Sequence, residues 1–269
     1  MPSGRYLKAA LTLLPGTRGT ALPDRELSRR NVTVDRDHLA RYDRVCGFRL
    51  TDALPATYPH VLAFPLAMSL MSGSGFPFPV VGLVHVANRI TLRRPIGSGE
   101  TLDLMVRAEN LRPHRRGQVF DVVATAFASG EQVWTGVSAY LSKGSGKSEG
   151  HGTRDHAPGP APTAVWKVPA RVGPDYAAVS GDHNPIHTSR IGARVFGFPR
   201  PIAHGMWSKA RCLAALEGRL PAEYTVDVSF KQPILLPATI GFAASERDRG
   251  WEFRLDGKRP HLAGQVTHP

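Results

Sequence analysis

The sequence predicts an α+β protein made of two similar halves. In the first half, segments rich in valine and threonine follow one another between Gly and Pro turns, which is typical of consecutive antiparallel strands. A segment that is apolar nearly all round precedes them and favours a helix enclosed on most sides. The same order of elements recurs beyond residue 162. At 269 residues the chain is long enough for two units, each with its own core.

In the first half, the sequence predicts a strand at 31–34 followed by a short helix at 35–46. Asp35 is a suitable N-cap for this helix and Gly47 a suitable stop. The apolar helix follows at 59–71, where Pro65 either bends it or marks its true first turn. The run at 9–14 reads better as a strand than as a signal peptide. Further strands are expected at 80–86, 88–93, 101–109, 119–128 and 132–141.

Residues 142–162 are rich in Gly, Ser and Pro and contain almost nothing that could be buried, so they predict a flexible linker. The domains expected from this are an N-terminal unit at 1–141, the linker at 142–162 and a C-terminal unit at 163–269. In the C-terminal unit we expect a strand at 165–170, a short helix at 175–179, a helix at 205–217 and strands from Tyr224 onward.

Individual residues repeat as well. An offset of 134 superimposes Tyr42, Val45 and Gly47 on Tyr176, Val179 and Gly181, and an offset of 138 superimposes Pro95-Ile96 on Pro233-Ile234. The first offset also places Phe48 over Asp182 and Ala53 over His187. The N-terminal unit therefore has the framework of the second without its polar groups. Chance similarity is the alternative explanation of these short matches.

Those polar groups belong to Ser-Gly-Asp-His-Asn-Pro-Ile-His at 180–187, followed by Arg-Pro-Ile-Ala-His-Gly-Met at 200–206. Asp182 and His187 lie five residues apart on a turn that Gly181 and Pro185 keep from being regular helix. A carboxylate and an imidazole placed in this way can both point at one small object such as a water. The alternative is a turn without chemistry, because Asp, Asn and Pro are common turn formers.

Charge and composition limit the classes of binding partner and the compartment that the sequence suggests. A formal charge of +12 favours a polyanionic partner, but the basic residues are dispersed and match no nucleic-acid-binding motif. No apolar run reaches the roughly 18 residues that a membrane span needs. Only Cys46 and Cys212 occur, which fits a reducing cytoplasm. His151 and His156, with Asp155, lack a further His or Cys to complete a metal site, so neither metal nor cofactor is expected.

The two-part motif resembles the hydratase motif of the MaoC-like family, which includes (R)-specific enoyl-CoA hydratases and 3-hydroxyacyl-thioester dehydratases. The resemblance covers residues 176–216 closely, and the N-terminal unit resembles the degenerate copy found in two-repeat members. It implies a double hot-dog fold, in which each antiparallel sheet wraps a central helix. It also implies one active site per chain, carried by the C-terminal unit.

By this resemblance, the chain reversibly hydrates trans-2-enoyl thioesters to (R)-3-hydroxyacyl thioesters. Asp182 is then the general base, His187 holds the same water and helps deliver a proton, and the Gly205 backbone N–H polarises the thioester carbonyl. Asn184 secures the turn beside the substrate. The other residues expected to contact the substrate, an acyl-CoA or acyl carrier protein thioester, are Phe196, Arg200, Met206 and Trp207.

Some alternatives stay open at this stage. Arg194, Arg200 and Lys209 surround the motif and could meet phosphates of the carrier, or could be ordinary solvated surface. A hot-dog acyl-CoA thioesterase and a non-catalytic acyl-thioester-binding subunit are the competing functions. Two repeats in one chain can mimic a dimer, so both a monomer and a homodimer of such chains fit the sequence.

Overall fold

The fold consists of two runs of elements in the same order, and the computed structural model describes residues 21–144 and 161–268. The first run is β1 (Glu26–Val32), α2 (Arg36–Cys46), α3 (Tyr58–Met71), β2 (Val84–Leu92), β3 (Leu102–His114), β4 (Gly117–Ala128) and β5 (Glu131–Lys143). The second run is β6 (Ala164–Val168), α4 (Val172–Ser180), α5 (Pro185–Thr188), α6 (Arg190–Val195), α7 (Gly205–Ala215), β7 (Tyr224–Phe230), β8 (Ala238–Arg247), β9 (Gly250–Asp256) and β10 (Pro260–Thr267).

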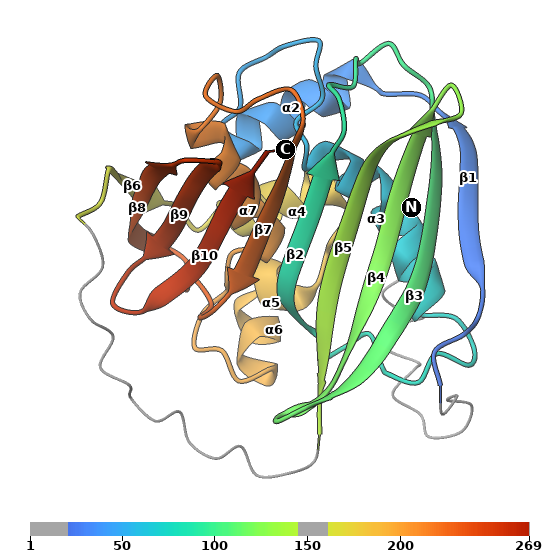
Figure 1. Cartoon of the computed structure of the whole chain (residues 1–269). Coiled ribbons are helices and arrows are strands. Elements are labelled where there is room, and N and C mark those ends of the chain that lie inside the picture. The colour runs from blue at the N-terminus through green and yellow to red at the C-terminus, as the bar shows by residue number, and fades with distance from the viewer. Residues whose placement is uncertain (1–20, 145–160, 269) are drawn as a thin grey trace.

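The ten strands form one antiparallel sheet in the order β1-β3-β4-β5-β2-β7-β10-β9-β8-β6, with the helices behind it in Figure 1. The first five strands come from the first run and the last five from the second. Each run thus builds a five-stranded sheet around one central helix, α3 or α7. This confirms the predicted double hot-dog fold. The two sheets are continuous, because β2 pairs with β7 from Ala87 opposite Ser229 to Leu92 opposite Tyr224.

The predicted signals at the helix ends account for α2. The Asp35 side chain accepts hydrogen bonds from the backbone N–H groups of Asp37 and His38, and Gly47 ends the helix with a φ of 82°. The central helix α3 is buried along most of its length, and Pro65 lies inside it, so this proline does not mark the first turn. Pro59 occupies the first turn instead.

Two expected strands proved to be one. The predicted break at residue 87 is not a gap, since β2 continues from Val84 to Leu92 and only its register against β5 shifts between His85 and Ala87. Residues 80–83 form a turn instead, closed by a hydrogen bond from the Leu83 N–H to the Val80 carbonyl. Gly82 has a φ of 96° there, a conformation that favours glycine. The expected strand at 9–14, residues 151–156 and most of the expected linker lie outside the described residues.

A buried lysine joins α7 to the line where the two sheets meet. Lys209 is 0% exposed, and its Nζ donates to the carbonyls of Asn88 on β2 and Val226 on β7 at 3.1 and 3.0 Å, and to Asn88 Oδ1 at 2.6 Å. All three acceptors are uncharged, so burial lowers the pKa of Lys209. The expectation that Lys209 could meet phosphates at the surface was therefore wrong.

Two further sequence expectations concern the cysteines and the membrane. Cys46, at the end of α2, and Cys212, on α7, are buried free thiols. Burial raises the pKa of both, so they pack as small apolar side chains rather than react. Within 21–144 and 161–268, no helix is both long and apolar enough to cross a membrane.

Candidate active site

The motif forms a turn that its own side chains hold in place. Helix α4 ends at Ser180, and Gly181 follows with a φ of 75°. The Asn184 N–H donates to Asp182 Oδ1 at 3.2 Å, and the Asn184 side chain caps α5 by accepting from the Ile186 N–H at 3.3 Å. Pro185 is the first residue of α5. The structure thus places Asn184 where it secures the turn.

Helix α5 brings His187 into the core of the site. Its ring is buried, and Nδ1 lies 2.8 Å from the backbone carbonyl of Ile202. Because a carbonyl can only accept, Nδ1 carries the proton and Nε2 of the neutral ring keeps its lone pair. Burial lowers the pKa of His187, although the nearby Asp182 carboxylate acts in the opposite direction. His187 is therefore a neutral hydrogen-bond acceptor at neutral pH.

A second histidine, His204, is packed against the first. Their ring centroids are 3.7 Å apart, with the rings stacked. His204 Nε2 lies 3.0 Å from the backbone carbonyl of Asp182, to which it donates, and 3.9 Å from Asp182 Oδ2. Burial first, and then the neighbouring His187, lower the pKa of His204 to about 3. His204 thus holds the main chain of Asp182 as a neutral donor.

Asp182, His187 and His204 converge closely enough to share one small molecule. One oxygen or nitrogen atom from each lies within 4.8 Å of the others. Two hydrogen bonds of about 2.8 Å to a single water span roughly 4.5 Å, so a water fits between the carboxylate and an imidazole nitrogen. A metal ion fits less well, because His204 Nε2 carries its proton toward the Asp182 carbonyl and has no lone pair to offer a metal.

Gly205 begins α7 directly after His204. The side chain of His204 is turned to Asp182 and does not cap the helix, so the first N–H groups of α7 are not satisfied from that residue. A Cβ at position 205 would lie 3.1 Å from the ring of Phe230, which is tighter than an ordinary contact. Glycine therefore lets the helix N-terminus approach the site, where its N–H groups and dipole favour a developing negative charge.

The other expected substrate contacts are spread more widely. Met206 and Trp207 are buried, and Trp207 Nε1 donates to the Val45 carbonyl on α2 at 3.0 Å, which ties the two halves together. Phe196 is 40% exposed after α6. Arg200 is exposed, and its Nη1 lies 3.5 Å from the Pro237 carbonyl. The structure does not bring these four side chains together at the motif, and their contact with substrate remains a prediction.

Sequence reasoning placed no site residue in the N-terminal half, yet that half faces the motif. Five ring-bearing side chains on α3, β2, β5 and β7 form what we call the aromatic wall. They are His60, Phe64, His85, Tyr140 and Phe230. A Cβ added at Gly181 would lie 3.8 Å from the Phe64 ring, and Phe230 packs at Gly205. His85 stacks on Tyr140 and lies against Phe230, with centroids 4.7 and 5.0 Å apart. In the sequence, the signal that could have found them is the presence of His60 and His85 within strongly apolar segments.

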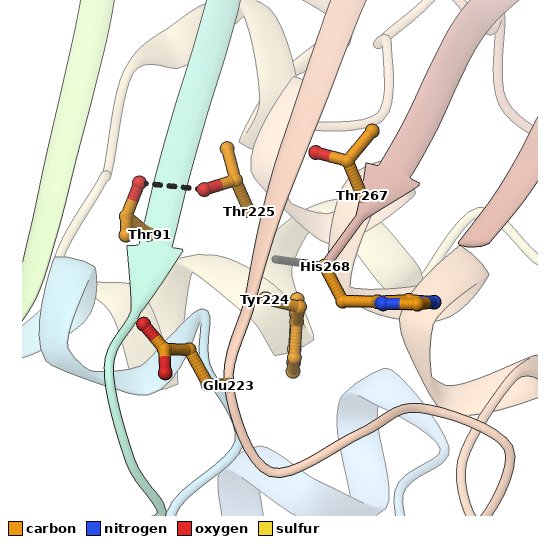
Figure 2. Close-up of a pocket in the computed structure, with 6 residues that line it drawn as sticks. All are labelled: Thr91, Glu223, Tyr224, Thr225, Thr267 and His268. Atoms are coloured by element: carbon orange, nitrogen blue, oxygen red, sulfur yellow. Dashed lines mark hydrogen bonds between the residues drawn. The ribbon is translucent and has the colours of Figure 1, made fainter. Parts of the chain in front are cut away.

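Behind Phe64 lies a narrow cavity of about 10 Å³ between α3 and strands β4 and β5. It is lined by Phe64 and His60 near the motif and, farther away, by small side chains, among them Ala63, Ala67, Ala124 and Gly136. A larger open hollow of about 290 Å³ lies at the ends of β2, β7 and β10, as Figure 2 shows. The hollow is lined by none of the motif residues, and Thr91 and Thr225 hydrogen-bond each other there. We therefore assign no chemistry to it.

Comparison with known proteins agrees with this geometry. The family model of the MaoC-like domain matches residues 169–257, which include the whole motif and α7. The chain is 41% identical over 275 residues to 3-hydroxyacyl-thioester dehydratase X of Mycobacterium tuberculosis, covering 98% of both proteins. It is also 25% identical over 177 residues to the enoyl-CoA hydratase ChsH3 of the same organism, covering 63% of this chain and 58% of that protein.

Solved structures agree as well. The crystal structure of HtdX of Mycobacterium tuberculosis matches with a TM-score of 0.81 at 39% identity, covering 90% of this chain and 99% of that one. A MaoC-like dehydratase from Phytophthora capsici matches with a TM-score of 0.76 at 21% identity, covering 92% and 96% of the two chains, which is a likeness of fold. On this evidence, the chain belongs to the MaoC-like dehydratase family.

Proposed function

We propose that this protein is a hydro-lyase that interconverts trans-2-enoyl thioesters and (R)-3-hydroxyacyl thioesters, with one site per chain. The observation that carries the proposal is the convergence of Asp182 and His187 within 4.8 Å beside the N-terminus of α7. Addition of water to an enoyl thioester needs a base for the water and a donor for the enolate oxygen. This site offers both.

The proposed chemistry follows from the protonation states. The Asp182 carboxylate takes a proton from the water while the water oxygen forms a bond to C3 of the substrate. Neutral His187 orients the water by accepting a hydrogen bond from its other O–H at Nε2. The electron pair of the C2–C3 double bond moves onto the thioester oxygen, where the Gly205 N–H donates to it. The Asp182–His187 pair then returns a proton to C2. Dehydration runs through the same steps in reverse.

The acyl chain is proposed to enter the cavity behind Phe64. The space itself is only about 10 Å³, so this entry requires side chains such as Phe64, which lies against Gly181, to move, while the small Ala63, Ala67 and Gly136 offer little obstruction. The N-terminal half then shapes the chain-binding pocket while the C-terminal half supplies the acid–base pair. This division explains why Phe48 can stand where the second copy has Asp182.

Carrier, compartment and assembly are proposed more coarsely. The relatives named above are an acyl-thioester dehydratase and an enoyl-CoA hydratase, so a CoA or acyl carrier protein thioester is the substrate class proposed here. Exposed Arg200 near the motif is a candidate contact for carrier phosphates. The free thiols of Cys46 and Cys212 agree with a reducing cytoplasm. Since one chain supplies both the motif and the aromatic wall that faces it, a homodimer is not required for activity.

The test is hydration of crotonyl-CoA, followed by loss of the enoyl-thioester absorbance and chiral analysis of the 3-hydroxybutyryl product. We expect turnover to the (R)-product, and Asp182→Asn and His187→Ala each to lower kcat by about 100-fold or more. Circular dichroism and thermal melting of each variant check that it is folded. A thiol reagent added in parallel detects free CoA.

Two outcomes contradict the proposal. Release of free CoA without a 3-hydroxyacyl product would favour a thioesterase. Binding of crotonyl-CoA and of longer enoyl-CoAs without turnover of any would favour an acyl-thioester-binding subunit. Full activity in either folded variant would remove the assigned role from that residue.

A further inference from the structure

The start of β2 contains a bulge that changes which side chain faces the site. Along β2 and β5, Ala87 pairs with Ala139 but His85 pairs with Tyr140, so Val86 is the extra residue. Val86 and Ala87 both pack on the outer face of the sheet, against Val119, Ala139 and Leu141. Regular alternation would instead have paired Val86 with Tyr140 and turned Val86 inward. The bulge therefore puts a histidine where an unbroken strand would have put a valine.

The neighbours of His85 show that it faces the site. Its ring stacks on Tyr140 at 4.7 Å, lies 6.3 Å from the ring of His60, and is tilted against Phe230 at 5.0 Å. Phe230 in turn contacts the position of Gly205, the first residue of α7. β2 and β5 are adjacent strands, with α3 behind the sheet (Figure 1). His85 thus lies across the site from the motif, one aromatic ring away from Gly205.

One nitrogen of this ring has no use within the protein. His85 Nε2 is buried, and among the residues that the structure describes it has no hydrogen-bond partner. A buried polar atom of this kind costs stability, so native proteins satisfy nearly all of them. Burial lowers the pKa of His85 to about 3, while a hydrogen bond to the backbone of Ala87 acts in the opposite direction. The neutral ring therefore bonds the backbone through its other nitrogen and keeps a lone pair on Nε2.

We propose that His85 is a substrate-positioning residue whose Nε2 accepts a hydrogen bond from a donor group on the bound thioester. The proposal rests on the proposed function and extends the site to the half that lacks the motif. Two donors have the right chemistry: an amide N–H of the pantetheine arm, or a hydroxyl group on the acyl chain. The Tyr140 and Phe230 rings that pack on His85 shield this hydrogen bond from water and so strengthen it.

Two variants and three substrates test this. His85→Phe keeps a flat ring for stacking on Tyr140 but removes the acceptor, whereas His85→Gln places an amide oxygen near the position of Nε2. The substrates are crotonyl-CoA, S-propyl thiocrotonate, which has no amide, and trans-5-hydroxy-2-hexenoyl-CoA. His114→Phe, at the far end of β3, is the matched control for the substitution.

If the donor is the pantetheine amide, His85→Phe raises KM for both CoA thioesters roughly fivefold to tenfold, the value of one lost hydrogen bond, and leaves S-propyl thiocrotonate unchanged. If the donor is an acyl hydroxyl, only the hydroxylated substrate is affected. In either case kcat changes less than KM, since the chemistry of Asp182 and His187 is untouched, and folded His85→Gln recovers KM to within about threefold of wild type.

The outcomes that overturn the inference are separate from those that overturn the function. Wild-type turnover of crotonyl-CoA tests the function alone. Equal losses on all three substrates, or no loss on any, would show that His85 binds no donor of the substrate. A folded His85→Gln protein as impaired as His85→Phe would show the same, because the acceptor would then not matter.

Discussion

The rings of His187 and His204 are stacked with their centroids 3.7 Å apart, and each bonds a backbone carbonyl through one nitrogen, that of Ile202 or of Asp182. Burial lowers the pKa of both rings and keeps them neutral, and the neighbouring His187 lowers the pKa of His204 further. The hydrogen bond to Ile202 fixes the tautomer of His187, and the hydrogen bond from His204 fixes the main-chain position of Asp182. Both are needed for a water to be held between the carboxylate and the ring.

The role of His204 can be tested with a pair of substitutions. His204→Phe keeps a flat ring against His187 but removes the hydrogen bond to the Asp182 carbonyl. We expect kcat for crotonyl-CoA to fall about tenfold with little change in KM, because one hydrogen bond that positions the base is lost. His204→Gln retains an N–H donor at a similar reach and should recover most of this loss. Equal activity of His204→Phe and wild type would show that Asp182 needs no such support.

The low pKa of His204 predicts a loss of stability in acid. Its pKa is about 3 in the folded protein and 6.5 when unfolded, so below pH 6.5 the unfolded state binds more protons. Stability from this group is complete above pH 6.5 and declines as the pH falls toward 3. One such histidine costs about 2 kcal/mol between pH 7 and pH 5. Unfolding in guanidinium chloride at the two pH values measures the sum of this contribution and those of other buried groups, such as His60 and His85.

A variant is needed to isolate this contribution, because Asp43 acts in the opposite direction. Burial raises the pKa of Asp43 to about 7, so its folded form gains stability as the pH falls from 7 toward 3.8. In His204→Gln the Asp43 contribution is kept and that of His204 is gone. The free energy of unfolding of wild type relative to this variant should therefore fall by about 2 kcal/mol from pH 7 to pH 5. A constant difference would mean that His204 is not kept neutral by the fold.

The sequence was sufficient for the fold class and for the turn that carries Asp182 and His187. Those predictions rest on local signals: the Asp35 cap, the Gly47 and Gly181 helix ends, and a motif whose residues are close in the chain. The double repeat added the relation between the halves. All of these depend on a few neighbouring residues, which is why they could be read without knowing which segments pack together.

What the sequence did not reveal depends on contacts between distant segments. Lys209 looks like a surface residue by type, but it finds three carbonyl or amide oxygens where β2 meets β7. His85 faces the site only because Val86 forms a bulge against β5, and no local signal distinguishes that bulge from regular alternation. The aromatic wall likewise joins α3 to strands of both halves.

The small side chains of the cavity behind Phe64 predict a limit on acyl length. Ala67 is buried one turn after Phe64 on α3 and lines the cavity. In Ala67→Leu, three added carbon atoms exceed that space of about 10 Å³ and block it, so we expect kcat/KM for dodecenoyl-CoA to fall at least tenfold while crotonyl-CoA changes less than threefold. Ala215→Leu, on the exposed last turn of α7, is the control. Equal losses on both substrates would place the chain elsewhere.

The two halves meet at Arg89 and Asp227, which face each other in the β2–β7 pairing with Arg89 Nε 2.7 Å from Asp227 Oδ1. The offset of 138 that aligns Pro95 with Pro233 also aligns Arg89 with Asp227. Equivalent positions of the two repeats therefore pair with each other here. Two identical charges would repel, and the chain carries opposite ones instead. Arg89→Asp or Asp227→Arg alone should lower the free energy of unfolding by about 1 kcal/mol, since the pair is partly exposed. The double exchange should restore it, as a double-mutant cycle in guanidinium chloride can show, whereas additive losses would mean that the pair contributes nothing.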